Sequence, residues 1–302
     1  MDVGAAEVAG MVATIAAPAH TARLAPWLFV LPAVSWCAAV LLLPSLVGAG
    51  YAATEWDGLT APEFVGAANV AEFAGSPQGR DVLVHTVVLA VGYVVAVNVV
   101  GLVLALGVNG PGRGALRAVF FLPAVLSPLV VGYIWKFVLD ATGPLNSALR
   151  AVGLDGLAQP WLGRPGTALA AIGLVMVWQF AGYHMLIYLA GLAGVDRTLT
   201  EAAAVDGARR WRRFRDITLP QLRPAVTIGV ALSTISALTV FDQVMALTGG
   251  GPAGGTETLG SYIYKQAFGN GRYGFSAAVA LVMVVFVAGV GLVQLRMLRG
   301  RR

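Results

Sequence analysis

Polar side chains inside long apolar stretches are the residues of this sequence best suited to chemistry. Their amide, hydroxyl, carboxyl and aromatic groups can hydrogen-bond or stack on a polar solute. A polar group that faced lipid would stay unsatisfied, so we expect these groups to face a cavity. The candidates for such a solute path are Asn98, Trp178, Gln179, Tyr183, Ser236, Thr239, Asp242 and Gln243. For each Ser or Thr the alternative is a bond to its own helix or to a neighbouring helix.

Several other kinds of site are absent from the sequence. The phosphate-binding pattern G-x-x-x-x-G-K-[ST] does not occur, and the glycine-rich stretch Thr248–Pro252 contains no lysine. Any nucleotide must therefore bind to another chain. No paired carboxylates and no nucleophile with a nearby base stand at usable spacing, which argues against an enzyme. His20, His85 and His184 are far apart and Cys37 is the single cysteine, so no metal site and no disulfide is predicted.

The elements that must carry these polar residues are membrane spans. Of the 302 residues 58% are hydrophobic and 12% are charged, against about 25% charged in soluble domains. Six apolar stretches approach the roughly 20 residues needed to cross a bilayer. They cover about Leu24–Tyr51, Val82–Val108, Leu116–Leu139, Thr167–Leu192, Ala225–Leu247 and Phe275–Leu295. We therefore predict an all-α, polytopic membrane protein with six transmembrane helices in residues 23–302. Residues 1–22 are too short in their apolar part to span a membrane, and we expect a cytoplasmic N-terminal tail there.

The positions of the basic residues predict the orientation of these spans. With the N-terminus inside, fourteen of the twenty Lys and Arg residues lie on the inner side. The positive-inside rule then makes both termini and the loop 193–224 cytoplasmic. The same rule explains the net charge of +5 without a nucleic-acid partner. The outer loop 52–80 is acidic, with Glu55, Asp57, Glu63 and Glu72, and it could either dock a soluble protein or be an ordinary solvated loop.

The charged loop 193–224 has its own helix signals. The stretch from Thr198 to Glu201 reads as a capping box, in which the Thr and Glu side chains bond the first free backbone N–H groups. Three alanines at 202–204 then favour a short helix. Gly207 follows as the residue best able to leave that helix with a positive φ.

The second half of this loop predicts a further helical segment. Trp211, Phe214 and Ile217 recur every three residues and should pack on the membrane domain. The arginines between them, at 209, 210, 212, 213 and 215, should face water. Pro220 and Pro224 should break the helix where the next span begins.

Loop 193–224 resembles the loop by which the membrane subunits of ABC importers contact their ATPases. The matching positions are Glu201, Ala202, Ala203, Asp206, Gly207, Ala208, Phe214, Ile217, Leu219, Pro220 and Pro224. It departs from the family pattern at Thr198, where proline is common, and at Arg209, where a small polar residue is frequent.

A second resemblance is to permeases of carbohydrate importers, of the maltose and glycerol-phosphate type and specifically the first of their two permease subunits. It is carried by Leu122-Pro123, Trp135, Gly143–Asn146, Phe241-Asp242, Leu247–Pro252, Thr256, Tyr262–Tyr264 and Ala267-Phe268. The resemblance covers the chain from about residue 80 to its end. The first eighty residues match only in hydropathy.

These resemblances imply a type I ABC importer permease fold in a bacterial inner membrane. The chain would translocate a sugar or oligosaccharide delivered by an extracytoplasmic solute-binding protein. Its implied partners are membrane lipid, a second homologous permease and two ATPase subunits, which would hold the ATP and Mg, so this chain itself would need no cofactor. Coupling to the ATPase is implied for Glu201, Ala202, Ala203, Asp206, Gly207 and Ala208.

Two alternatives remain at this point. The first is an ABC permease for glycerol-phosphate or a polyamine. The second is an ion-coupled secondary transporter, which would need ionisable residues near the middle of the membrane. That second alternative, like a membrane enzyme, leaves loop 193–224 unexplained.

Overall fold

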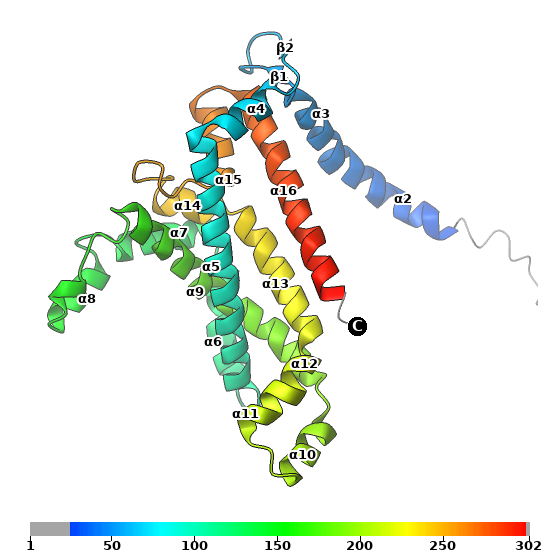
Figure 1. Cartoon of the computed structure of the whole chain (residues 1–302), viewed down its shortest axis with the longest axis vertical. Coiled ribbons are helices and arrows are strands. Elements are labelled where there is room, and N and C mark those ends of the chain that lie inside the picture. Colours follow the sequence, from blue (N-terminus) through cyan, green and yellow to red (C-terminus); the bar gives the residue numbers. More distant parts are fainter. Residues whose placement is uncertain (1–24, 300–302) are drawn as a thin grey trace, which may run out of the picture. The chain divides into compact units, whose positions relative to one another are not determined.

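The computed structural model describes residues 25–299, which are mostly helical (Figure 1). The chain divides into two units, residues 1–50 and 51–302, and each is described by itself. In the first unit one helical run comprises α2 (Ala25–Cys37), the π-helical η1 (Ala38–Leu42) and α3 (Leu43–Tyr51). From Phe29 on, its large apolar side chains are exposed, as is expected of a span surrounded by lipid. The tail predicted for residues 1–22 lies outside the described residues.

The second unit begins with a small structured loop. Strand β1 (Thr54–Glu55) pairs antiparallel with β2 (Glu63–Phe64), and helix α4 (Ala68–Gly75) follows. Buried Asn69 on α4 donates to the carbonyl oxygens of Ala52 and Thr54 at 3.1 and 2.8 Å. The all-α class is confirmed, with this ribbon as the one sheet among the described residues.

Two long helices form the centre of the second unit. Helix α5 (Pro77–Val108) and helix α9 (Pro165–Ala193) each begin with a proline in the first turn, where its missing N–H costs no hydrogen bond. They pack on each other and on α13 (Arg223–Leu238), with α16 (Tyr273–Arg299) beside α13. The core between them is apolar and includes Tyr93, Val97, Ile172, Val175 and Leu238.

The third predicted span is broken. It forms α6 (Gly114–Val125) and α7 (Pro128–Val138), which meet at an angle of 95°. Pro128 disfavours helical geometry at the residue before it, and Ser127 has a ψ of 132°. The single helix predicted for 116–139 is therefore wrong, although Pro128 marked the position of the break.

The fifth predicted span is broken as well. Helix α13 has 16 residues, fewer than the roughly 20 that cross a bilayer, and α14 (Asp242–Leu247) begins after an irregular turn at residues 239–241. The continuous helix predicted for 225–247 is therefore also wrong. No proline marks this second break.

By length and composition, four described helices can cross a membrane, or five if α6 and α7 together count as one. The six-span count is thus not confirmed, whereas the first predicted span and the spans predicted in α5, α9 and α16 are present. The shorter elements of the second unit are α8 (Pro144–Ala151), η2 (Asp155–Leu157), α10 (Arg197–Val205), α11 (Arg210–Arg213), η3 (Phe214–Thr218), α12 (Leu219–Gln221), α15 (Leu259–Tyr264) and η4 (Lys265–Gly269).

Polar side chains from other elements satisfy the backbone at both breaks. The carbonyl oxygen of Leu126 accepts a hydrogen bond from Gln179 Nε2 at 3.0 Å, and that of Val240 accepts one from Thr258 Oγ1 at 3.0 Å. Broken helices in membranes depend on such partners, because lipid offers none. The halves beyond the breaks, α7 and α14, pack closely, and a Cβ on Gly132 would lie 2.5 Å from Ala246 Cβ.

Candidate functional site

Helix α10 of loop 193–224 begins two residues earlier than the sequence predicts. Its N-cap is Asp196, whose Oδ1 accepts from the Thr198 N–H at 2.8 Å and from Thr198 Oγ1 at 2.7 Å. These bonds hold the pKa of Asp196 below its ordinary value. The capping box from Thr198 to Glu201 is therefore wrong, because the Thr198 N–H is already bound to a carboxylate, which is itself a favoured cap.

The exit of α10 follows the prediction. Gly207 has a φ of +78°, which favours glycine. Its N–H donates to the Ala204 carbonyl at 3.1 Å, and the Ala208 N–H donates to the Ala203 carbonyl at 2.9 Å. This pair of bonds is a Schellman motif, which closes the helix over a left-handed residue.

The residues predicted to contact an ATPase lie together on this short helix and its exit. Glu201, Ala202, Asp206 and Gly207 are exposed, and Ala203 and Ala208 are half-buried. Val205 beside them is 89% exposed. The side chains of Glu201 and Asp206 form no ion pair with any described residue. A capped helix with free charges at its tip is suited to enter a cleft on another protein, and the assignment of these residues to coupling stays a prediction.

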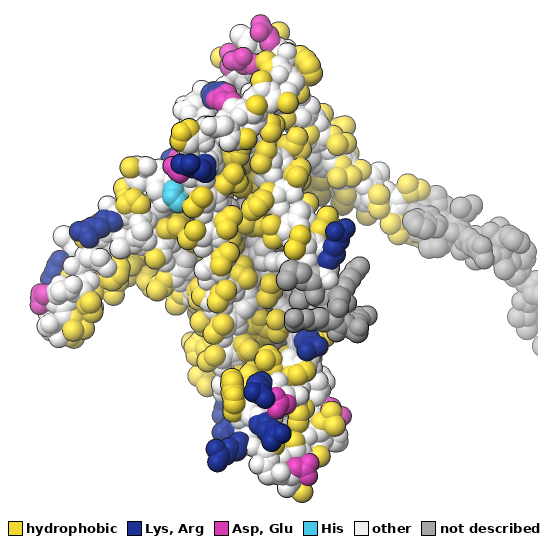
Figure 2. All heavy atoms as spheres, in the orientation of Figure 1, with side chains coloured by type: hydrophobic (Ala, Val, Ile, Leu, Met, Phe, Trp, Pro, Cys, Tyr) yellow, Lys and Arg dark blue, Asp and Glu magenta, His cyan; other side chains and the backbone are white. Residues whose placement is uncertain are grey.

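The second half of the loop differs from the prediction in three ways. Trp211 is 69% exposed and lies beside Phe214, with 5.6 Å between the ring centroids and the ring planes tilted by 35°, so it does not pack on the membrane domain as predicted. Arg210 and Arg213 line a cavity instead of facing water only. The break expected at Pro224 is present as a one-residue turn at Leu222, just before α13 begins. The break expected at Pro220 is wrong, because the backbone stays helical from η3 through this proline into α12. In Figure 2, basic side chains gather over this end of the second unit.

Gln179 and Gln243, both predicted for the solute path, meet at the broken helices. Their side chains are buried, and Gln243 Nε2 donates to Gln179 Oε1 at 3.2 Å. Beside them Trp178 is 43% exposed and lies edge-on to Trp135, 5.3 Å between ring centroids. This region combines a satisfied amide pair with an accessible indole face, which can stack on the apolar face of a ring.

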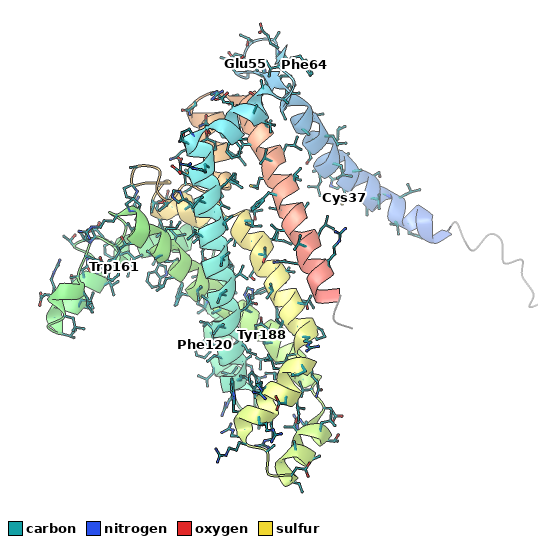
Figure 3. All side chains as sticks on the ribbon, in the orientation of Figure 1. Cys37, Glu55, Phe64, Phe120, Trp161 and Tyr188 are labelled. Atoms are coloured by element: carbon teal, nitrogen blue, oxygen red, sulfur yellow. The ribbon has the colours of Figure 1, made fainter. Side chains whose placement is uncertain are left out.

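Asn98 lies apart from that group, in a polar contact between three helices. Its Nδ2 donates to Ser233 Oγ at 2.9 Å, and its Oδ1 accepts from the Tyr188 hydroxyl at 2.5 Å. Tyr188 (Figure 3) is fully buried. The Asn98 amide thus joins α5, α9 and α13, and no part of it needs a solute to be satisfied. Tyr188 was not predicted from the sequence, although a hydroxyl inside an apolar stretch is a usable signal.

The remaining solute-path candidates lie at the surface of the second unit. Tyr183 is 41% exposed, and Ser236 and Thr239 are exposed. Thr239 Oγ1 bonds the Ile235 carbonyl of its own helix at 2.9 Å, which is the alternative foreseen for hydroxyl residues. Asp242 is half-buried at the first position of α14. The structure does not enclose these four residues in one pocket with Gln179.

A partly buried ion pair beside the glycine-rich stretch was not predicted from the sequence. Glu257 Oε1 accepts from Lys265 Nζ at 2.5 Å, and Gln78 Nε2 donates to its other oxygen at 3.3 Å. A side chain on Gly250 would collide with both members of the pair. Gly250 in the stretch Thr248–Pro252 therefore lies against a charge pair, and glycine permits this close approach. Among residues 25–299, no three His, Cys, Asp or Glu side chains converge as metal ligands.

Known proteins resemble this chain over most of its length. Residues 97–301 match the family described as "Binding-protein-dependent transport system inner membrane component". A probable permease protein for starch degradation products from Thermoanaerobacterium thermosulfurigenes is 31% identical, over 91% of this chain and 94% of its own length. The permease protein MsmF of a multiple sugar-binding transport system from Streptococcus mutans is 32% identical, over 90% and 94%.

A solved structure shares the fold. It is a bacterial ABC transporter involved in the import of the polysaccharide alginate, and it matches with a TM-score of 0.80 and 23% identity over 93% of this chain and 97% of that chain. The family and the several apolar helices make this chain a multi-pass membrane protein and a transport component rather than an enzyme. The chain belongs to the family of inner membrane components of binding-protein-dependent transport systems, the permeases of ABC importers.

Proposed function

We propose that this chain is one of two permease subunits of an ABC importer for a sugar or oligosaccharide. Helix α10, with a carboxylate cap at Asp196 and a left-handed exit at Gly207, is the observation that carries the proposal. Asp206 is exposed at the end of this short, closed helix, and Glu201 is exposed on its side, where it also lines a cavity. Such a helix can transmit movement of an ATPase to the membrane domain without any covalent chemistry in this chain.

Two ATPases, which would hold ATP and Mg, and a second homologous permease complete the proposed assembly. The family description supports the requirement for a solute-binding protein outside the cell. The acidic residues of the loop 52–80 are its proposed docking surface. Both termini and loop 193–224 are proposed to lie in the cytoplasm, because fourteen of the twenty basic residues lie on that side of the predicted spans.

A sugar is the proposed solute because related permeases serve starch degradation products and multiple sugars. The accessible rings of Trp178 and Tyr183 can stack on a pyranose, and Ser236, Thr239 and Asp242 can accept or donate hydrogen bonds. Asp242 is half-buried and the other four groups are exposed on this chain, and a second permease would enclose them. Gln179 and Gln243 stabilise the break between α6 and α7 beside this surface. The amide of Asn98 instead joins helices of the fold.

The test is to tag this chain, purify it gently from its native membrane, and identify the proteins that accompany it. Recovery of a second permease and an ATPase is expected. Replacement of Gly207 by Asp should leave membrane insertion intact and weaken or abolish recovery of the ATPase. Recovery of this chain alone in several detergents would contradict the proposal and favour an ion-coupled carrier.

The proposed solute path is tested on exposed residues, since these make no bond that the fold depends on. Trp178→Ala with Tyr183→Ala should reduce sugar-dependent uptake while the complex still assembles. Two results together would favour the alternative solute classes. The double variant would take up every sugar tested as the wild type does, and the wild type would take up glycerol-phosphate or a polyamine.

A further inference from the structure

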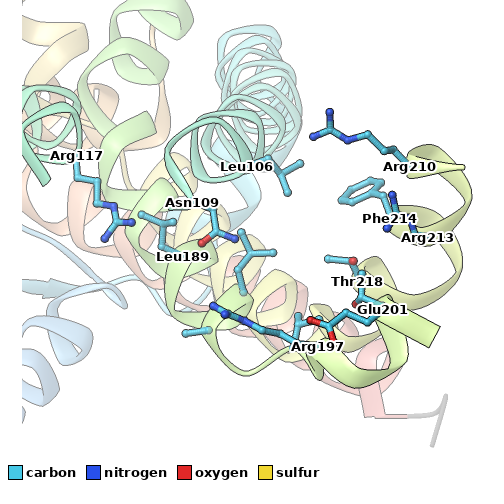
Figure 4. Close-up of a pocket in the computed structure, with 14 residues that line it drawn as sticks. Leu106, Asn109, Arg117, Leu189, Arg197, Glu201, Arg210, Arg213, Phe214 and Thr218 are labelled. Atoms are coloured by element: carbon cyan, nitrogen blue, oxygen red, sulfur yellow. The ribbon is translucent and has the colours of Figure 1, made fainter. Parts of the chain in front are cut away.

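A cavity of about 570 Å³ lies between the ends of α5 and α9 and the segments α10, α11 and η3 (Figure 4). Leu106, Leu189 and Leu192 form an apolar part of its wall. Its polar part is strongly basic, with four arginines and one glutamate among the lining side chains. These are Arg117, Arg197, Arg210, Arg213 and Glu201. The cavity lies outside the solute path, and it shares only Glu201 with the residues predicted to couple to the ATPase.

Of the four arginines in α11 and η3, two line the cavity and two do not. Arg212 and Arg215, which do not line the cavity, share the carboxylate of Asp216 at 3.7 and 2.7 Å. Arg210 and Arg213, which do line it, have no carboxylate within 4.0 Å among the described residues. The positive-inside rule explains basic residues in this loop, but it does not explain why those facing the cavity are the unneutralised ones.

Arg213 provides a buried donor beside the cavity that the described chain does not satisfy. Its Nε is buried and has no hydrogen-bond partner in the described chain. A buried donor without a partner is rare, because it has lost water and gained nothing in exchange. In Figure 4 this side chain lies with Arg210 and Phe214 at one side of the cavity. An acceptor in the cavity would satisfy the donor.

Arg117 closes the other side of the cavity in a fixed position. Its guanidinium donates to the carbonyl oxygens of Val108 and Gly110 at 3.0 to 3.2 Å, which holds it at the end of α5. A guanidinium ordered by the backbone can bind an anion without a further loss of side-chain freedom. The cavity thus offers donors from two sides and an apolar wall between them.

We propose that this cavity binds a phosphate group. Arginine forks match the geometry of phosphate oxygens, and several of them together can neutralise its charge. The phosphate can belong to an anionic phospholipid, whose chains would pass along Leu106, Leu189 and Leu192, or to a soluble phosphate. An anion bound here would join the ends of α5 and α9 to the segment that follows α10.

The test compares two double variants that lose the same charge. R210Q/R213Q removes the unneutralised pair, and R212Q/R215Q removes the pair that contacts Asp216. In one arm each full-length protein is exchanged into vesicles of equal phosphatidylcholine and phosphatidylglycerol, and native mass spectrometry measures the phosphatidylglycerol retained. In the other arm delipidated protein is melted with inorganic phosphate or with chloride at equal ionic strength.

We expect R210Q/R213Q to lose about tenfold or more in affinity for the phosphate ligand in one arm. R212Q/R215Q should bind that ligand about as well as the wild type. Loss in the first arm identifies a phospholipid, and loss in the second identifies a soluble phosphate. R210K/R213K keeps the charge and should recover part of the binding. The melting temperature of this variant without phosphate shows whether it is folded, and so separates misfolding from lost affinity. Equal behaviour of the two glutamine variants in both arms, or no binding by the wild type in either, would overturn the proposal.

Discussion

At Gly207 the backbone φ is +78°, and no heavy atom lies within 4 Å of the position that a Cβ would take. A side chain therefore meets no collision there, and its cost is the left-handed backbone alone. Gly194 also follows a helix, but its φ is −89°, so the same substitution should be harmless at that residue. The two glycines form a matched pair for testing whether conformation or space matters at the exit of α10.

We expect Gly207→Ala to destabilise the exit of α10 by about 1 kcal/mol, because a non-glycine residue is strained in this conformation. Gly207→Asn should cost less, since Asn enters the left-handed region more readily. Hydrogen exchange of the amides of α10 and uptake by the assembled transporter measure the effect. Gly194→Ala is the control, and equal losses at both glycines would contradict the role of φ.

Gln179 and Gln243 make a second pair with unequal expected effects. Gln179→Leu leaves both the Leu126 carbonyl and the Gln243 amide without partners, whereas Gln243→Leu leaves only the Gln179 oxygen. Each unsatisfied buried group costs about 1–3 kcal/mol. Thermal unfolding of the purified protein should therefore show a larger loss for Gln179→Leu. Tyr183→Phe, at an exposed position, should melt with the wild type.

The stability of helix α10 depends on its N-cap. Its first turn is held by Asp196, and neutralising that carboxylate removes the acceptor for Thr198. The pKa of Asp196 is lowered in the folded state, first by the Thr198 hydroxyl and then by its N–H. A lowered pKa means that the cap contributes its stability above the unfolded value of about 3.9, and loses it as the pH falls through the folded value.

Asp196→Ala should cost about 1 kcal/mol of local stability, and Asp196→Ser should retain most of the cap. Exchange protection of the Thr198 and Leu199 amides, corrected for intrinsic rates, is the measurement. In the wild type this protection should decline only in acid below the unfolded pKa, whereas in Asp196→Ser it should not follow the titration. Identical acid profiles for the two proteins would show that another group holds the turn.

For the whole molecule, the single cysteine makes orientation measurable. Cys37→Ser provides a cysteine-free background, because no other cysteine exists in the chain. Leu59 and Val205 are 93% and 89% exposed and lie on opposite sides of the predicted spans. Both sites are therefore accessible to a reagent that can reach their side of the membrane.

In intact cells a membrane-impermeant thiol reagent should label Leu59→Cys and not Val205→Cys. Permeabilised cells should give labelling of both, which controls for accessibility. Labelling of Val205→Cys alone in intact cells would reverse the proposed orientation. Such a result would leave the fold and the family untouched, since neither depends on which side the loop occupies.

Local signals in the sequence determined much of this protein. Hydropathy averaged over about 20 residues located the helices α5, α9 and α16, since burial in lipid requires apolar length. The short helix α10 and its left-handed exit at Gly207 followed from residues adjacent in the chain, although the N-cap was placed two residues too late. The family pattern lies in the same local stretches, which is why the permease class was predictable.

Tertiary structure decided how the polar residues are used. Asn98 bonds Tyr188 across 90 positions of sequence and Gln243 bonds Gln179 across 64, and no local pattern specifies such partners. The breaks near Leu126 and Val240 are stable because Gln179 and Thr258 reach their carbonyl groups from other elements. Composition likewise cannot show which arginines find Asp216 and which face a cavity. Spans and caps are local properties, whereas hydrogen-bond satisfaction belongs to the packed molecule.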